Sequence, residues 1–143
     1  IKKGLSRAFW PGRLEIISEE PLVVLDGAQN VASAVVMREA VKDLFKYKRL
    51  ILVLGISSDK AIKGGCSELY GLADEVVLTR TSNPREASPK ELSGYFYGKK
   101  LYFTASVKEA RSKAYDLAGR DDLILVCGSL FVVGEFRHEA LGD

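Results

Sequence analysis

The sequence predicts an α/β protein with a Rossmann-like, mostly parallel sheet of about six strands, the first antiparallel, and helices on both faces. Short apolar runs without polar alternation, at 22–25, 50–54 and 123–127, are typical of strands that are covered on both faces. Segments with helical spacing of apolar residues separate these runs. Because the two kinds of segment alternate along the chain, right-handed βαβ crossovers are expected.

The first half of the chain supplies two strands, a helix and a third strand. The apolar residues Leu14, Ile16 and Ile17 indicate a short strand that ends at Glu20-Pro21. Its connection to the run 22–25 is too short for a crossover, so the two strands are expected to be antiparallel. A helix is predicted from 31 to 47, since apolar residues fall three or four apart at Ala34, Met37, Val41, Leu44 and Phe45.

The second half continues the alternation. A helix is predicted from about 62 to 72, strands at 76–79 and 101–104, and an amphipathic segment from Gly128-Ser129 to about Leu141. Two further helices are predicted to begin at Ser88 and Ser106. Each serine is followed three residues later by a glutamate, which is the pattern of a capping box.

Small and polar residues follow several of the predicted strands. After the second strand come Asp26, Gly27, Gln29 and Asn30, where glycine suits a turn with positive φ and asparagine a helix cap. Ligands of open α/β sheets bind beyond the carboxyl ends of the strands, so this cluster is a candidate site. A structural alternative stays open, in which Asp26 bonds only to nearby backbone amides and Asn30 only caps its helix.

Composition excludes several classes of protein. The length is that of about one domain, and no apolar run is long enough to cross a membrane, so a cytoplasmic protein is expected. A net charge of +2 argues against nucleic-acid binding. The two cysteines and single histidine, Cys66, Cys127 and His138, lack the spacing of a metal site or a disulfide framework. The first residue is Ile1, and the only methionine is internal, which indicates a piece of a longer protein.

Common nucleotide-binding motifs are missing from the sequence. There is no G-x-x-x-x-G-K-[ST] and no G-x-G-x-x-G after a predicted strand. Any role in nucleotide binding is therefore expected to be shared with another domain. No nucleophile motif, general base or other catalytic residue is identified in the chain.

Four motifs occur together in one order and spacing. They are W-P-G-R at 10–13, D-G-A-Q-N at 26–30, G-I-S-S-D-K at 55–60 and G-S-L-F-V-V-G-E at 128–135. Together they resemble the C-terminal domain of folylpolyglutamate and dihydrofolate synthases, relatives of the Mur ligases. The resemblance implies that residues 1–13 end an interdomain linker, that 14–143 form the C-terminal domain, and that an N-terminal P-loop ATPase domain is absent from this chain.

The resemblance also implies an ATP-dependent amide ligase. ATP would phosphorylate a carboxylate of folate or dihydropteroate, and the amino group of L-glutamate would attack the acyl phosphate. ATP and Mg²⁺ would be held mainly by the missing N-terminal domain. The isolated chain is accordingly expected to be inactive.

The matched residues receive the family's roles by resemblance. Arg13 and Asp26 are the expected ATP contacts, because a guanidinium suits phosphate oxygens and a carboxylate suits ribose hydroxyls. Lys60 is a candidate contact for a further anionic group. Gly27, Asn30 and Gly128 are expected to shape the cleft.

Gln29 and Ser129 fall where the family binds glutamate. Ser129 follows a glycine at a predicted helix start, where its hydroxyl can join backbone N–H groups in holding a carboxylate. Position 29 departs from the family pattern D-G-A-H-N. Glutamine keeps a hydrogen-bond donor but cannot take a proton near neutral pH, so a role that needs an imidazolium is lost.

Two alternatives to this ligase remain. The chain can be a free-standing, non-catalytic domain that binds a small anion or a partner protein, since it lacks its own nucleotide-holding motif. It can also belong to a related Mur-type amide ligase with a different acid substrate, because the acid would be selected largely by the missing domain.

Overall fold

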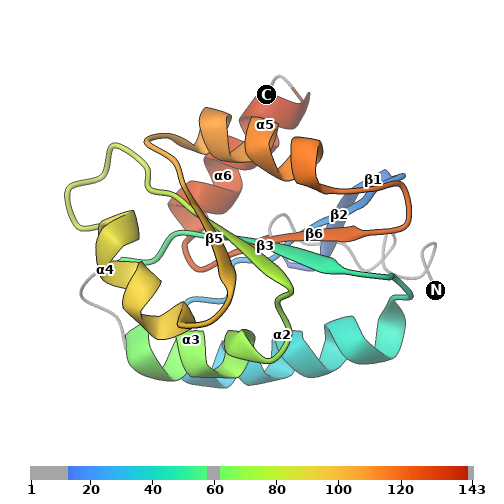
Figure 1. The fold of residues 1–143 in the computed structure, drawn as a ribbon, viewed down its shortest axis with the longest axis horizontal. Helices are drawn as coiled ribbons and strands as arrows, with labels where there is room; N and C mark the ends of the chain where they lie inside the picture. Colours follow the sequence, from blue (N-terminus) through green and yellow to red (C-terminus); the bar gives the residue numbers. More distant parts are fainter. Residues whose placement is uncertain (1–12, 58–61, 142–143) are drawn as a thin grey trace.

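The computed structural model describes residues 13–57 and 62–141 and has the predicted α/β architecture (Figure 1). Six strands form one sheet in the order β1-β2-β6-β3-β4-β5. Their bounds are β1 Glu15–Glu19, β2 Leu22–Leu25, β3 Leu50–Leu54, β4 Glu75–Leu78, β5 Lys100–Phe103 and β6 Leu123–Cys127. Strand β1 pairs antiparallel with β2, and every other neighbouring pair is parallel, as the sequence predicts.

Helices cover both faces of the sheet. The helices are α2 Val31–Leu44, α3 Ile62–Tyr70, α4 Pro89–Ser93, α5 Val107–Leu117 and α6 Leu130–Leu141, with a short 3₁₀ turn η1 at Gly94–Phe96. Figure 1 shows α2 and α3 on one face and α5 and α6 on the other. Successive residues of β3 alternate between the two cores: Leu50, Leu52 and Leu54 pack toward α2 and α3, and Ile51 and Val53 toward α5 and α6. Continuous apolar strands are the consequence of this double covering.

Helix starts follow the prediction with one correction. The hydroxyls of Ser88 and Ser106 accept hydrogen bonds from Glu91 N and Glu109 N, as expected of N-caps. The two predicted capping boxes are both wrong in their second half: the carboxylate of Glu91 accepts no hydrogen bond from Ser88 N, and that of Glu109 accepts from Ala105 N, at 2.8 Å, one residue before the cap. Helix α2 ends at Leu44, three residues before its predicted end, and Phe45 follows in extended conformation.

Gly128, at the end of β6, has the positive φ that the sequence predicts for Gly27. Gly27 was expected to have a positive φ, but among the described glycines only Gly98 and Gly128 do, with φ of 86° and 106°. A Cβ on Gly128 would lie 2.4 Å from the carbonyl oxygen of Gly55, at the end of the neighbouring β3. The close approach of two strand ends therefore requires glycine at position 128.

The amino ends of the strands are joined by charged side chains. Arg49 donates to Glu75 Oε2 at 2.5 Å, to Asp122 Oδ2 at 2.8 Å and to the carbonyl of Leu117 at 2.8 Å. The hydroxyl of Tyr102, on β5, donates to the other oxygen of Glu75 at 2.8 Å. These groups connect the starts of β3, β4, β5 and β6. Arg49 therefore has a structural role, because its guanidinium donates to acceptors within the protein.

A second buried ion pair links the two ends of the described chain. Glu15, the first residue of β1, is 4% exposed and accepts from Arg137 Nε of α6 at 2.9 Å. Cys66 and Cys127 are buried free thiols, and His138 is exposed. No helix within the described ranges is long and apolar enough to span a membrane, and a cytoplasmic location stays a prediction.

Substitution of Gly128 by alanine is expected to destabilise the fold by at least about 2 kcal/mol, because the new methyl group meets a backbone oxygen and the residue keeps a positive φ. Urea unfolding measures the change. The matched control is Gly134→Ala in α6, where a Cβ meets nothing within 4 Å, and where alanine should stabilise by about 0.5–1 kcal/mol. Equal effects at the two positions would contradict the steric account.

Candidate functional site

The carboxyl ends of three adjacent strands are joined by backbone hydrogen bonds. Asp26 N donates to Val126 O at 2.9 Å, Gly128 N to Ala28 O at 3.0 Å and Gly55 N to Cys127 O at 3.4 Å. The chain leaves β2 for α2 on one face and leaves the adjacent β6 for α6 on the other face. Neighbouring strands whose helices diverge in this way form the crevice where open α/β sheets bind ligands.

A pocket of about 560 Å³ lies beside the end of β2. It brings together five of the residues singled out in the sequence, namely Arg13, Asp26, Gly27, Gln29 and Asn30. Gly128 and Ser129 do not line it, although the next residue, Leu130, does. Lys60, Trp10, Pro11 and Gly12 lie outside the described residues.

Asp26 combines a structural role with free acceptor capacity. Its Oδ1 accepts from Ala28 N at 2.8 Å and its Oδ2 from Leu14 N at 3.2 Å. A carboxylate has about four lone-pair sites, so each oxygen keeps one for a ligand. Burial raises the pKa of the Asp26 carboxyl, while the two backbone donors and the positive charge of Arg13 lower it. The structural alternative for Asp26 is therefore right about its backbone bonds, and these bonds leave room for a ligand.

The turn after Asp26 is fixed by a full capping box. Asn30 Oδ1 accepts from Ser33 N at 2.8 Å, and Ser33 Oγ accepts from Asn30 N at 3.2 Å. The same hydroxyl accepts from the backbone N–H of Gln29 at 3.2 Å. The backbone of Gln29 is thus held in place at the pocket, and Asn30 caps α2 as the sequence predicts.

Ser129 occupies the start of α6 rather than the pocket wall. It is 2% exposed, and its Oγ accepts from Phe131 N at 3.0 Å and from Val132 N at 3.2 Å. The hydroxyl therefore acts as an N-cap, with its own hydrogen still available as a donor. The structure shows this capping role, and the glutamate contact of Ser129 stays a prediction.

An apolar wall of the pocket was not foreseen. It is formed by Leu14, Ala32, Val36, Met37, Ala40 and Leu130. Residues 32, 36 and 40 are four apart, so they form a second stripe on α2 beside the stripe that faces the core. Val36 is 69% exposed, and a valine on the solvent side of an amphipathic helix was the signal available in the sequence.

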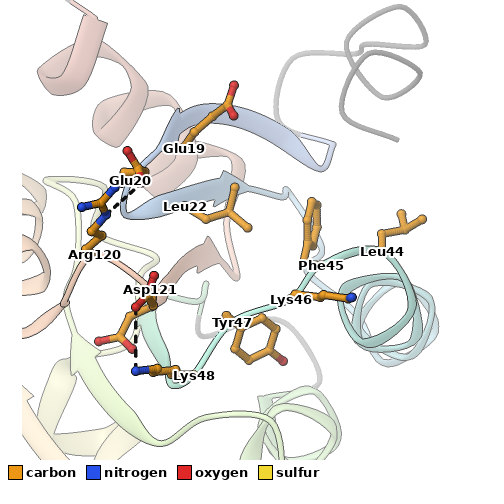
Figure 2. A pocket seen from close by; sticks show the side chains of 11 residues that line it. Glu19, Glu20, Leu22, Leu44, Phe45, Lys46, Tyr47, Lys48, Arg120 and Asp121 are labelled. Carbon is orange, nitrogen blue, oxygen red and sulfur yellow. Dashed lines mark hydrogen bonds and ion pairs between the residues drawn. The ribbon is translucent and has the colours of Figure 1, made fainter.

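A larger pocket, of about 940 Å³, lies at the opposite edge of the sheet, where the parallel strands begin (Figure 2). Figure 2 shows Arg120 directed at Glu20 and Lys48 at Asp121, pairs that lie 2.9 and 3.8 Å apart. Leu22 and Phe45 also line this pocket. Because these cations and carboxylates pair with one another and the strand carboxyl ends are at the far edge, the smaller pocket is the better candidate site.

Metal ligands are not grouped in the described part of the chain. No three of its His, Cys, Asp and Glu side chains come together in an arrangement that could hold a metal ion.

The chain matches the family model of the Mur ligase glutamate ligase domain over residues 12–130. It belongs to this family. The matched range contains β1 through β6 and every residue that lines the smaller pocket. The fold described above is thus that of a Mur ligase glutamate ligase domain.

Several relatives of this Mur ligase domain are known. A probable bifunctional folylpolyglutamate synthase/dihydropteroate synthase of Haloferax volcanii is 38% identical over 143 residues, which cover 96% of this chain and 16% of that protein. A structure of Escherichia coli FolC in complex with DHPP and ADP is 32% identical, with a TM-score of 0.85, and covers 92% of this chain. A bifunctional folylpolyglutamate synthase/dihydrofolate synthase with Mn, AMPPNP and L-glutamate bound is 30% identical, with a TM-score of 0.83, and covers 94%. The chain spans 31% and 32% of these two solved chains.

The raised pKa of Asp26 predicts a pH-dependent stability difference. A carboxyl whose pKa is higher in the folded Mur ligase domain than its ordinary 3.8 favours folding when protonated, so its contribution falls as pH rises through the folded pKa. Asp26→Asn removes this loss. The free energy of unfolding of the variant, minus that of the wild type, should become more positive as pH rises from about 3.8 toward neutral. Denaturant titrations at several pH values test this, and a difference that stays constant would contradict it.

Proposed function

We propose that this chain is the C-terminal domain of an ATP-dependent ligase that adds L-glutamate to a folate or dihydropteroate carboxylate. ATP phosphorylates the acid, and the glutamate amine attacks the acyl phosphate with release of phosphate. A tetrahedral intermediate collapses to the amide. The remaining parts of the active site would come from an N-terminal P-loop domain.

One observation carries the proposal. A chain of the glutamate ligase family places Arg13, Asp26 and Gln29 around a single pocket beyond the end of β2. These side chains supply a cation, an anion with spare lone pairs and a neutral amide, which suit phosphate, ribose and amino-acid groups respectively. Structures of relatives with ADP and DHPP bound, and with AMPPNP and L-glutamate bound, support a ligase that takes a nucleotide, an acid and glutamate.

In the proposed mechanism Arg13 binds phosphate oxygens of ATP, where its charge stabilises the negative charge that develops during transfer. Asp26 accepts hydrogen bonds from the ribose hydroxyls through the lone pairs that Leu14 and Ala28 leave free. Mg²⁺, when bound with ATP, neutralises phosphate charge. Its protein ligands are assigned to the N-terminal domain.

Glutamate is assigned to the side of the pocket nearest α6. Gln29 donates from its side-chain amide, and Ser129 donates its hydroxyl hydrogen while its oxygen caps the helix. Lys60 is retained as an anion contact. Because Gln29 stands where histidine is usual in the resembling family, this proposal needs no proton transfer at position 29.

The test is ADP release by the full-length protein that contains this domain. The protein is supplied with ATP, magnesium and L-glutamate, and in separate reactions with dihydropteroate or a reduced folate. Release that requires both glutamate and one of the acids supports the proposal and identifies the acid. Silence with both acids, from folded protein that still binds ATP, would overturn the folate assignment in favour of another acid.

Arg13→Ala and Asp26→Ala in the full-length protein are expected to raise KM for ATP or lower kcat by at least about tenfold, or about 1.4 kcal/mol. The loss arises because phosphate and ribose each lose a charged partner. Arg120→Ala is the matched control, since Arg120 is exposed in the pocket at the opposite edge of the sheet. Steady-state kinetics that leave both site variants at wild-type values would contradict these roles.

A further inference from the structure

Leu14 has a backbone conformation that leucine rarely adopts. Its φ is 48°, and it is the only residue other than glycine with a positive φ among the described positions. Such a conformation costs an L-residue with a side chain roughly 1–2 kcal/mol. It persists only where surrounding contacts hold it.

Two contacts hold Leu14. Its N–H donates to Asp26 Oδ2 at 3.2 Å, and its side chain is partly buried against the core formed with α2 and α3. The other oxygen of Asp26 accepts from Ala28 N at 2.8 Å. One carboxylate therefore joins the chain entering β1 to the turn leaving β2.

The position of Arg13 depends on this arrangement. Residue 13 precedes Leu14 directly, and rotation about the N–Cα bond of Leu14 turns everything before it. A change of φ from 48° to a usual helical or extended value is a rotation of roughly 110° or more, which would carry Arg13 away from the pocket that it lines.

We propose that Asp26 is a positioning residue for Arg13: by accepting the Leu14 N–H, it holds Leu14 at positive φ and so keeps the guanidinium at the pocket. This inference rests on the proposed role of Arg13 in ATP binding. It adds to the ribose contact proposed for Asp26, because the two uses occupy different lone pairs. Loss of the Asp26 carboxylate then weakens ATP binding partly through Arg13.

The first test measures the Leu14 amide directly and needs no activity. Hydrogen–deuterium exchange is followed in the full-length protein without substrates, for the wild type, Asp26→Asn and Asp74→Asn. An amide at 26 has one accepting oxygen, and the shorter bond from Ala28 N is the one we expect it to keep, so the Leu14 N–H meets the NH2 group and its exchange should become at least about tenfold faster. Asp74→Asn is the matched control, because Asp74 Oδ2 accepts from Leu50 N, at 2.7 Å, at the opposite edge of the sheet. An unchanged Leu14 rate in Asp26→Asn would overturn the proposal.

The second test asks whether relieving the backbone cost restores ATP binding. Glycine adopts positive φ readily. The double variant Leu14→Gly/Asp26→Asn should therefore have a KM for ATP at least about threefold lower than that of Asp26→Asn alone. Leu14→Gly alone is measured beside it, because Leu14 also lines the pocket and its own effect on KM has to be subtracted. Additive losses with no recovery would show that Asp26 acts by direct contact alone and would overturn the positioning role.

The two tests separate this inference from the proposed function. Absence of any glutamate-dependent ADP release from the wild type would remove the ligase assignment, whereas the exchange rate of Leu14 would still report on its contact with Asp26. A ligase with normal Leu14 exchange in Asp26→Asn would retain its function and lose the positioning role.

Discussion

The close approach of the backbone at the ends of β3 and β6 is the constraint on which the candidate site depends. Gly128 can lie against the carbonyl of Gly55 because it has no Cβ, and its N–H then reaches Ala28 O in the turn after β2. Three strand ends are thereby held in one rim. The start of α6, with Leu130 at the pocket, follows directly from that bend.

The two edges of the sheet use charge differently. At the amino edge, Arg49 is surrounded by acceptors from three parts of the chain, so its charge stabilises the fold. At the carboxyl edge, Asp26 keeps unused lone pairs, and Arg13 is exposed beside it. Burial disfavours the ionised form of Asp26 and so raises its pKa. A nearby cation, on the protein or on a ligand, stabilises the ionised form and opposes this rise.

Much of the fold could be predicted because its signals are local. Continuous apolar runs identify strands buried on both faces, and the short connection at Glu20-Pro21 determines the antiparallel pairing of β1. The sequence predictions that were wrong concern which of several neighbouring residues makes a contact or adopts a conformation. Glu109 reaches Ala105 N instead of Ser106 N, and positive φ occurs at Gly128 instead of Gly27, because tertiary neighbours decide both.

The site was predicted less completely than the fold for a similar reason. The motif at 26–30 located one side of the pocket, but the apolar wall comes from α2 positions such as Val36 that sequence reasoning treats as solvent-facing. No sequence rule places a left-handed leucine at position 14. Its conformation results from a hydrogen bond to a residue twelve positions away.

The ion pair between Glu15 and Arg137 has a mechanical consequence. Strand β1 is at the edge of the sheet and pairs only with β2, so a force on the chain before it would otherwise peel it away residue by residue. The buried pair attaches its first residue to α6. A pull on the chain before β1 therefore acts on α6 as well as on the pairing of β1 with β2.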